Sequence, residues 1–449
     1  MTRTKRTLPR PEGLFAAAVI LGATSVAHAG GFQINEQSAM HTGRAGAATA
    51  TVKDPSAIWY NPAGLAFIEG TAFQAGINFI RGHGAYEGPG LPSTNPNYPA
   101  ERSSEPERLD TNFIPVPHAY AARALSSKAF VGLGLYAPYG LGLKWDSPDT
   151  FSGRTSVQEI DLRTFFITPA IALRLTDHVA VAVGVSLVPG TVYLKRTLGA
   201  EDNGQVLFPA DIYGREASVE LSGSAFGVGA TAGVILTFLD HLKIGASFRS
   251  AVDLSFSGDA NFDLPSSVPA EVRANFPDQE VTADLTLPHT FQLGVGWDSD
   301  KFLVEVGGQL TLWNSYDELR LNFSTGLPAA TIVSPRNWKV VPLLRLGGEY
   351  RPIEDLAIRL GIAYDWNPAP DETVDPTLPD RNRFVASAGA GYSFGWLRLD
   401  AAWMILFLSE RDLNGNVNFP FRAPGDDVPQ GAYASGLVHV IAFTAGFQL

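Results

Sequence analysis

The side chains that most often carry out catalysis are few and scattered in this chain. Its eight histidines stand at positions 28, 41, 83, 118, 178, 241, 289 and 439, and cysteine is absent, which excludes disulfides, thiolate metal sites and cysteine nucleophiles. No H-E-x-x-H, G-x-S-x-G or phosphate-loop motif occurs. The run Asp412–Asn416 suggests a calcium loop, but it lacks the bidentate glutamate at its twelfth position. The sequence therefore predicts no catalytic residue, no metal site and no cofactor, and we expect the protein not to be an enzyme.

Two basic residues are candidates for binding a carboxylate. An amphipathic acid needs an apolar slot for its tail and a cation for its head, because a desolvated, unpaired carboxylate is very costly. Lys339 and Arg345 share one parity in a single predicted strand. The alternative for each cation is a structural salt bridge with a carboxylate of a predicted strand: Glu349, Glu305 or Asp365.

The composition indicates a β protein with a large apolar surface. Of the 449 residues, 45% are hydrophobic and 17% are charged, with 45 glycines and 27 phenylalanines. Ordinary soluble proteins carry about 25% charged residues. The 45 acidic residues outnumber the 33 basic ones, which gives a formal net charge of −12 and argues against a nucleic-acid partner.

The first thirty residues have the features of a secretory signal. Basic residues at positions 3, 5, 6 and 10 precede an apolar run from Gly13 to Ala27, and Ala27-His28-Ala29 follows as a cleavage site. We predict a signal peptide over residues 1–29. As a membrane anchor the run is too short, since about 20 residues are needed. No later stretch of 18 uncharged apolar residues occurs, so the mature chain is either a soluble exported protein or a membrane-spanning barrel.

Period-two alternation of apolar and polar residues predicts strands along residues 71–449, the predicted barrel domain. In 242–257 the even positions are mostly apolar and the odd ones small or charged, and 356–366 repeats this pattern. Fourteen strands are predicted, over 71–83, 116–124, 128–137, 160–175, 178–197, 217–238, 241–258, 281–298, 301–322, 338–350, 355–366, 383–394, 396–410 and 434–449.

The connections between these strands alternate strictly in length. Tight turns such as Thr176-Asp177 and Gly395 follow the even-numbered strands, and long loops rich in glycine, proline and asparagine follow the odd-numbered ones. This pattern on an even strand count is typical of an outer-membrane barrel with both termini in the periplasm. The fold class we predict is therefore all-β, a transmembrane antiparallel β-barrel of 14 strands. A soluble sandwich explains the alternation but not the loop asymmetry.

Strand parity also predicts which residues face lipid and which face the lumen. The apolar set would face lipid, with aromatic residues near strand ends at the two membrane interfaces: Tyr136, Trp297, Trp313, Tyr350, Trp366 and Trp396. The lumen set comprises small and charged residues, which would be costly in lipid: Lys243, Arg249, Asp253, Glu305, Gln309, Arg345, Glu349, Arg359 and Asp365.

Residues 30–70 do not alternate and precede the first strand. The segment is rich in small residues, yet it carries apolar side chains such as Phe32, Ile58 and Trp59 that a disordered tail would lack. It either hangs free in the periplasm or folds inward to plug the barrel, as in other plugged lumens. We expect the plug, or hatch.

This segment carries a resemblance to a known family. Gly31–Glu36, Gly43-Arg44-Ala45 and Asp54–Gly64, with Asn61-Pro62-Ala63 at its centre, resemble the hatch of the long-chain fatty acid outer-membrane transporters (FadL-like, including aromatic-hydrocarbon relatives). Further matches, such as Asn337-Trp338-Lys339, run in order along nearly the whole mature chain. The resemblance implies a fourteen-stranded barrel, Phe32, Asn61, Pro62 and Ala63 as hatch or gate residues, and Lys339 and Arg196 at the ligand head.

The resemblance also implies a route for the ligand. Two long loops with apolar residues, including Phe208 in one and Phe262 and Phe276 in the other, would form the walls of an external capture groove. The alternative is that these loops only pack on each other. The exit would be lateral, beside a kink of the third strand, where Pro138 and Gly140 follow the predicted strand.

The function expected from these features is passive uptake of hydrophobic compounds, most of all long-chain fatty acids, across the outer membrane of a Gram-negative bacterium. The expected partners are these small molecules and the surrounding membrane lipid and lipopolysaccharide, and we expect a monomer. Two alternatives stay open: uptake of aromatic or aliphatic hydrocarbons by the same barrel, and a non-transporting adhesin or structural barrel with a permanent plug. The terminal Leu449 departs from the aromatic residue that usually ends such barrels and serves their assembly.

Overall fold

The structure is a computed structural model of the whole chain. The predicted signal peptide lies outside the residues that it describes. These residues are 30–87, 107–109, 113–146, 148, 151, 153–154, 156–198, 201–202, 205–206, 217–239, 241–266, 268–413 and 432–449.

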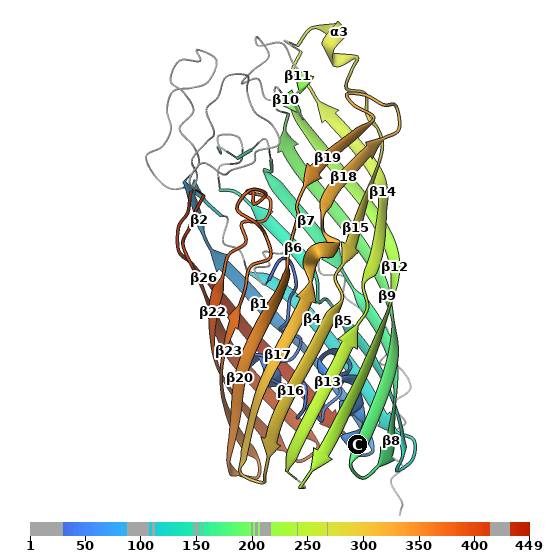
Figure 1. Ribbon diagram of the computed structural model, residues 1–449, viewed down its shortest axis with the longest axis vertical. Helices are drawn as coiled ribbons and strands as arrows, with labels where there is room; N and C mark the ends of the chain where they lie inside the picture. Colours follow the sequence, from blue (N-terminus) through green and yellow to red (C-terminus); the bar gives the residue numbers. More distant parts are fainter. Residues whose placement is uncertain are drawn as a thin grey trace, which may run out of the picture.

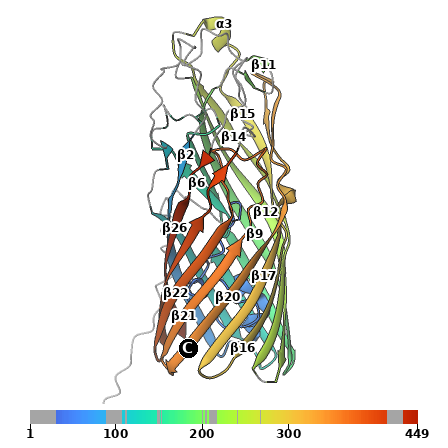
Figure 2. The same cartoon turned by 60° about the vertical axis from the view of Figure 1, so that its left-hand side comes forward.

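One antiparallel sheet of fourteen strands closes into a tall barrel (Figures 1 and 2). Eight strands are continuous: β1 (Thr71–His83), β4 (Ile114–Ala124), β9 (Val179–Thr197), β12 (Ser218–Phe238), β21 (Leu356–Asp365), β22 (Arg383–Phe394), β23 (Leu397–Leu408) and β26 (Gly436–Gln448). Six are broken into two pieces: β5 and β6 (Ala129–Tyr136, Gly140–Lys144), β7 and β8 (Glu159–Thr164, Phe166–Thr176), β13 and β14 (Leu242–Arg249, Val252–Asp263), β15 and β16 (Gln279–Leu287, Thr290–Asp298), β17 and β18 (Phe302–Leu312, Glu318–Phe323), and β19 and β20 (Thr331–Pro335, Val340–Ile353).

The barrel closes where the first strand meets the last. β1 pairs with β26 from Ala72 opposite Gln448 to His83 opposite Leu437, and on its other side with β4. The strand count and the alternation of short turns and long loops match the expectation from sequence. Short turns lie at the lower end of Figure 1 and the long connections at the upper end. Among the described residues, no helix is long and apolar enough to cross a membrane.

The long connections carry small elements of their own. These are α3 (Ala270–Arg273), the 3₁₀ turn η3 (Trp313–Ser315), a hairpin of β10 (Glu201–Asp202) and β11 (Gln205–Val206), and a four-stranded sheet of β2 (Ala85–Glu87), β3 (Glu107–Arg108), β24 (Arg411–Asp412) and β25 (Ala432–Tyr433). Each of two loops predicted from sequence contains a short strand that was not expected. β6 extends the third strand beyond its break at 137–139, and β19 begins the tenth strand earlier.

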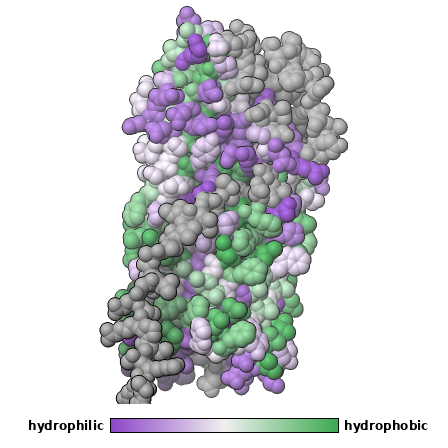
Figure 3. All heavy atoms as spheres, turned by 180° about the vertical axis from the view of Figure 1, so that it is seen from behind, coloured by the Kyte–Doolittle hydropathy of each residue, from purple (hydrophilic) through white to green (hydrophobic). Residues whose placement is uncertain are grey.

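In the lower barrel the outer wall is apolar and the lumen is polar. Exposed leucine, valine, isoleucine and phenylalanine side chains cover the outside, and Figure 3 shows them as a green lower region beneath a more hydrophilic upper one. Of the predicted lumen residues, the buried ones are Lys243, Arg249, Glu305, Gln309, Arg345, Glu349, Arg359 and Asp365. The parity prediction was therefore right for these eight.

Asp253 was wrongly predicted to face the lumen. The strand breaks at Ser250 and Ala251, and this break shifts the alternation by one residue, so Arg249 and Leu254 both point inward. A slip of one residue turns every following side chain to the other face. Asp253 is consequently exposed on the outside, where its carboxylate accepts a hydrogen bond from Thr286.

Two aromatic residues predicted at the membrane interface also face inward. Tyr136 is 1% exposed and Trp313 is fully buried, whereas Trp297, Tyr350 and Trp396 are 46%, 43% and 61% exposed on the outer wall. Tyr136 ends β5 and Trp313 begins η3 directly after β17, so both lie at strand breaks in the interior of a barrel that continues above them.

Residues 30–70, the hatch segment, lie inside the lower barrel (Figure 1, blue). The segment forms two single helical turns, α1 (Ala39–Thr42) and α2 (Ala57–Tyr60), and the 3₁₀ helix η1 (Pro62–Phe67). Asn61 ends α2 and caps η1, since its Oδ1 accepts the Ala63 N–H at 3.1 Å. Nearly every residue of the segment is buried, which accounts for apolar side chains in a stretch without strand alternation.

Candidate functional site

The hatch segment is attached to the wall by buried polar contacts. Glu305 on β17, fully buried, accepts hydrogen bonds from the backbone N–H groups of Thr49, Ala50 and Thr51 at 2.6, 3.1 and 2.9 Å and from the Thr51 hydroxyl at 2.7 Å. A buried carboxylate is tolerated only when its acceptor sites are satisfied, and these four donors come from one turn of the segment. The negatively charged Glu305 on the barrel wall therefore holds this turn of the hatch segment in place.

Asn61 and Arg249 make further attachments to the nearby strands β12 and β13. The Asn61 side-chain amide donates to the carbonyls of Thr49 and, on β12, Val234 at 2.7 and 3.1 Å. Arg249 donates to the Trp59 carbonyl at 2.6 Å and lies 3.7 Å from the centre of the indole ring. Gly233 leaves room for this contact, because a Cβ there would lie 2.0 Å from the Asn61 Oδ1 atom. The conformation of the Asn61-Pro62-Ala63 turn is thus fixed both by its own cap and by the wall.

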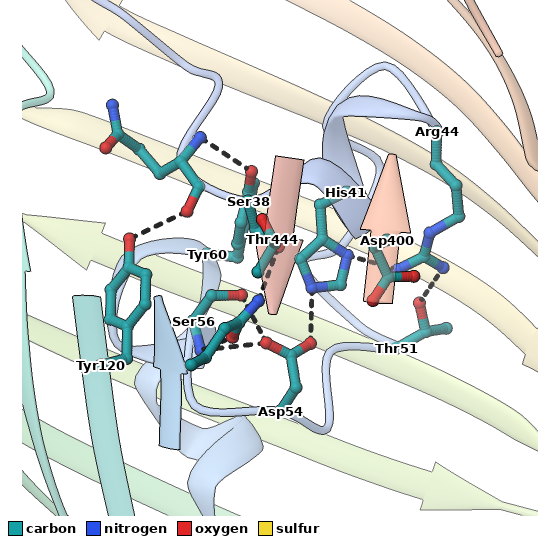
Figure 4. A network of polar contacts seen from close by, with 12 residues as sticks. Ser38, His41, Arg44, Thr51, Asp54, Ser56, Tyr60, Tyr120, Asp400 and Thr444 are labelled. Atoms are coloured by element: carbon teal, nitrogen blue, oxygen red, sulfur yellow. Dashed lines mark hydrogen bonds and ion pairs between the residues drawn. The ribbon is translucent and has the colours of Figure 1, made fainter. Parts of the chain in front are cut away.

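A buried network holds the hatch segment together internally (Figure 4). Arg44 donates to His41 Nδ1 at 2.7 Å, so the imidazole carries its proton on Nε2 and donates it to Asp54 at 2.7 Å. The Ser56 hydroxyl donates to the same carboxylate at 2.6 Å. Burial alone would raise the pKa of Asp54, but the His41 and Ser56 partners outweigh it and hold that pKa well below its ordinary value.

Above the hatch segment the lumen contains an apolar cavity. Its volume is about 130 Å³, and the surrounding atom-free space of about 1290 Å³ includes open solvent. Its walls come from the upper strand pieces: Leu141, Ile160, Leu162, Val192, Leu194, Leu221, Phe256, Leu285, Leu321 and Ile332. Concave, mostly apolar cavities with few polar groups are the usual form of small-molecule sites.

Aromatic rings form the floor of this cavity, and Phe32 of the hatch segment lies at their centre. Its ring centroid is 4.7 Å from that of Trp313 and 6.0 Å from those of Tyr316 and Trp338. Gly31 permits this packing, because its φ is +68° and a Cβ there would lie 2.6 Å from both tryptophans. The hatch segment and the cavity therefore share one residue, so a ligand on the floor touches the hatch directly.

Two arginines bring charge to the cavity lining. Arg196 on β9 is 7% exposed, and Arg336, between β19 and β20, is also 7% exposed and donates to Asp375 at 2.6 Å. Burial would lower the pKa of Arg336, but the Asp375 carboxylate and the Tyr316 hydroxyl outweigh it and raise that pKa above its ordinary value. The cavity thus holds a guanidinium that stays charged and is already paired with a carboxylate.

The cations predicted from sequence lie in different parts of the structure. Arg196 lines the cavity, as described. Arg345 is buried beside Gly46 of the hatch segment, where it donates to Gln309 at 3.0 Å. Lys339 was expected to share the lumenal parity of Arg345, and this expectation was wrong: its side chain is exposed. The strand begins only at Val340, after a left-handed turn at Asn337, so Lys339 does not follow the alternation.

Sequence reasoning missed Arg336, Asp375 and the aromatic floor around Trp338. Arg336 lies only three residues before Lys339 and stands in the same basic stretch. Its inward direction depends on the irregular turn before β20 and on the loop that supplies Asp375. No periodic signal in the sequence indicates either feature.

The predicted loop residues form a packed cluster where the structure describes them. Phe262 and Phe276 lie 5.6 Å apart in an edge-to-face arrangement, and Phe276 is buried. Phe262 also lies 6.2 Å from Phe323, whose cluster includes the cavity residues Leu221 and Leu321. Apolar contacts therefore run continuously from the loop tip to the cavity. Phe208 lies outside the described residues.

The wall has an interrupted ladder beside the third strand. Residues 114–118 of β4 pair with β1. Among the described residues, however, the pairing of β4 with β5 covers 119–124, and the strand paired with β6 is β7. The hatch segment fills this place: the Ile34 N–H donates to the Pro138 carbonyl at 2.7 Å, and the Gly140 N–H donates to the Phe32 carbonyl at 3.0 Å. Residues 32–34 of the hatch segment thus lie at the break in the wall, and one of them, Phe32, also lies in the cavity floor.

Comparison with known proteins decides the family. A family model described as outer membrane protein transport protein (OMPP1/FadL/TodX) matches residues 20–447. The chain belongs to this family. It is therefore an outer-membrane β-barrel of a transport-protein family, as the resemblance of its hatch motifs had implied.

Individual relatives and solved structures match this chain over most of its length. A long-chain fatty acid transport protein of Salmonella typhi is 24% identical over 410 residues, which cover 87% of this chain and 90% of the relative. A solved FadL homologue of Pseudomonas aeruginosa superposes with a TM-score of 0.78 at 21% identity, covering 93% and 99% of the two chains. The toluene transporter TodX of Pseudomonas putida gives 0.70 at 15% identity, covering 92% and 98%. These structural likenesses show the fold.

Proposed function

We propose that the protein takes up long-chain fatty acids by passive diffusion across the outer membrane. The observation that carries this proposal is the apolar cavity directly above a buried hatch segment, with Phe32 common to both. A ligand enters over the apolar loop cluster of Phe262 and Phe276, binds in the cavity, and leaves after the hatch segment shifts. No nucleotide-binding motif accompanies the barrel, so transport follows the concentration gradient.

The exit that we propose is lateral, through the interrupted ladder beside β5 and β6. Residues 32–34 occupy this place, and Phe32 also lies in the cavity floor, so a ligand that displaces Phe32 loosens the contacts at Pro138 and Gly140 as well. The polar anchors at Glu305 and Asn61 lie lower and keep the rest of the hatch segment seated. The lumen thereby stays closed to polar solutes while an apolar molecule passes sideways into the membrane.

In this proposal Arg196 and Arg336 bind the carboxylate head of the fatty acid. Both guanidinium groups lie on the cavity lining, where a charge-assisted hydrogen bond to a carboxylate is strong. The other two predicted cations, Lys339 and Arg345, lie outside the cavity lining. We assign Lys339 to the path by which a ligand approaches the cavity, and Arg345 to the contact between the wall and the hatch segment.

The test is uptake of radiolabelled oleate by a transporter-deficient strain that expresses this protein, its Arg336→Gln variant, or the control Arg320→Gln. Arg320 is an exposed arginine paired with Glu318 on β18, away from the cavity lining. We expect uptake above the empty vector for the wild type and the control, and a reduced rate for Arg336→Gln. No gain over the empty vector would end the fatty-acid proposal.

A second candidate is uptake of aromatic hydrocarbons, favoured by the aromatic floor and by the pairing of Arg336 with Asp375. A neutral ligand needs no cation, and the charges of this pair already compensate each other. Toluene uptake in the same strain separates the two candidates. Hydrocarbon uptake that is unchanged in Arg336→Gln, without any oleate uptake, would select the second.

A further inference from the structure

The interrupted ladder beside the third strand stops just before two prolines of β4. Among the described residues, the pairing of β4 with β5 ends at Ala119. If it continued in the same register, Pro117 would lie opposite Ala137 and Pro115 opposite Tyr139. Both prolines lie on the outer wall, where Pro115 is half-buried and Pro117 is exposed. The ladder therefore ends where β4 would have to continue with proline at every second position.

Both prolines lack an N–H group on the side of the third strand. In an antiparallel sheet, successive residues direct their N–H and C=O groups alternately to the two neighbouring strands. The ladder of β4 with β1 runs unbroken past both prolines, as far as Ile80 opposite Ile114. Because proline has no N–H, a ladder tolerates it where that group would point away from the partner strand. Pro115 and Pro117 therefore remove the two donors that would bond to the third strand.

The two carbonyl groups that would accept from these donors have other partners. In a hydrogen-bonded antiparallel pair each residue accepts from the residue opposite, so these acceptors are the carbonyls of Ala137 and Tyr139. The Gln37 side-chain amide of the hatch segment donates to the Ala137 carbonyl at 3.1 Å, and the Thr164 hydroxyl on β7 donates to the Tyr139 carbonyl at 2.7 Å. Gln37 is 0% and Thr164 is 1% exposed. Buried side chains thus take the place of β4 at both carbonyls.

The two prolines lie within the apolar band of the wall. Pro117 is seven residues and Pro115 nine residues from Ala124, the periplasmic end of β4. A rise of about 3.3 Å per residue and a tilt of about 40° place them about 18 and 23 Å above that end, within a band about 25 Å tall. An N–H group without an acceptor is very costly there, because hydrocarbon offers none. Proline can border an interrupted ladder at this depth without leaving a donor unsatisfied.

We propose that Pro115 and Pro117 keep this part of the wall unpaired and so maintain the lateral exit whether or not a ligand is bound. The proposal rests on the function proposed above, because it names residues that hold the exit of that function open. The wall then needs no rearrangement when a ligand leaves, and the movement is confined to the hatch segment. At these two positions β4 offers a passing molecule no N–H donor, which favours apolar ligands over polar ones.

The experiment replaces both prolines in Pro115→Val/Pro117→Val, which restores two N–H groups in residues that favour strands. Amide hydrogen exchange of the full chain in detergent is followed by mass spectrometry. We expect the two new amides to be protected as well as those of residues 119–124 in the same strand. Each departing ligand must then break two backbone hydrogen bonds, so oleate uptake by the transporter-deficient strain should fall about tenfold. Oleate affinity of the cavity should not change.

The matched control is Pro169→Val/Pro342→Val, which replaces two exposed prolines of the outer wall on β8 and β20. Its oleate uptake should equal that of the wild type, and an equal fall in both double variants would contradict the proposal.

Hydrogen exchange and uptake test the prolines and the exit separately. Fast exchange of the new amides at positions 115 and 117 would contradict the role of the prolines, whatever compound is transported. Protected amides together with unchanged oleate uptake would contradict an exit at this place. If the wild type takes up no oleate, the fatty-acid proposal fails, and the exchange result still decides whether the prolines keep the wall unpaired.

A double-mutant cycle with Thr164 decides the question if the double variant does not fold. Thr164→Val removes the donor to the Tyr139 carbonyl and should lower the Tm of the wild type by about 2 °C. In Pro115→Val the restored N–H supplies that carbonyl, so the same substitution should lower the Tm less. Equal losses of Tm in the two backgrounds would overturn the proposal.

Discussion

The lower and upper halves of this barrel place apolar side chains on opposite faces of the same strands. In the lower half valines and leucines such as Val183 and Leu293 face outward, and charged residues such as Glu305 face a lumen filled by the hatch segment. In the upper half Leu221 and Phe256 face inward around the cavity, while Glu220 and Asp253 lie on the outside. The apolar side chains face the outside in the lower half and the cavity in the upper half.

The change of face arises in two different ways. β12 is continuous, and its outward residues simply change from Phe226 and Val228 to Ser222 and Glu220 as the strand rises. The strand of β13 and β14 instead breaks at Ser250-Ala251, and the following apolar residues slip to the other face. A single barrel can therefore be both a membrane protein and a container for an apolar ligand, because its strands change their pattern at the membrane boundary.

The largest effect is expected from the lower half, in Glu305→Ala. Loss of the carboxylate leaves the N–H groups of Thr49, Ala50 and Thr51 without their acceptor in a buried site, which costs about 3 kcal/mol or more. The hatch segment should loosen and single-channel conductance in planar bilayers should rise. Glu318→Ala, which removes an exposed carboxylate of the upper half, is the control and should conduct no more than the wild type.

A charge in the upper half should act on the ligand and leave the hatch closed. Leu221→Asp places an unpaired carboxylate in the apolar cavity, so oleate affinity measured by calorimetry in detergent should fall by a factor of about 100. Conductance should stay at the wild-type level. Ser257→Asp, on the exposed outer face of β14, is the matched control. A rise of conductance in Leu221→Asp would contradict the separation of the two halves.

Arg336→Gln should have a smaller effect that depends on the ligand. Removing one charge-assisted hydrogen bond weakens the binding of an acid by about tenfold and leaves the corresponding alcohol unaffected. The ratio of oleate to oleyl alcohol affinity is the quantity to measure. An equal change for both ligands would show that Arg336 shapes the cavity through Asp375 without contacting the head group.

The smallest effect concerns the pH dependence of the hatch network. Because the pKa of Asp54 is lower in the folded protein than in the unfolded chain, its stabilisation is complete above the unfolded pKa of about 3.9 and is lost as the pH falls below it. The difference in Tm between the wild type and Asp54→Asn should be constant from pH 8 to pH 5 and should shrink below about pH 4. A difference that stays constant from pH 4 to about pH 2 would contradict the low pKa of Asp54.

Much of the barrel could be predicted from sequence because strand alternation and loop length are local signals. All fourteen strands were placed, and the parity of residues such as Glu305 and Arg359 was right. The errors lie at interruptions. Asp253 was misplaced because the alternation was extended through Ser250-Ala251, where the strand breaks. Lys339 was misplaced because the alternation was extended back beyond Val340, where the strand begins.

The candidate site was predictable only in part. The motif around Asn61 indicated the hatch through its resemblance to a family, and its buried position was then observed. The cavity floor brings together Phe32, Trp313 and Trp338. Phe32 precedes the two tryptophans by about 280 residues or more in the sequence, and an irregular turn separates Trp313 from Trp338. Such contacts depend on how the closed barrel positions its breaks, and no short-range pattern encodes them.

The central claim is that an apolar ligand occupies the upper cavity, directly on the hatch segment. The most direct measurement is a crystal structure of the protein soaked with 9,10-dibromostearate, with the bromine atoms located by anomalous scattering. The account predicts bromine peaks inside the barrel, within contact distance of Phe32 and Trp338, and a carboxylate near Arg336 or Arg196. Bromine peaks only on the outer wall, with the cavity empty of ligand, would contradict it.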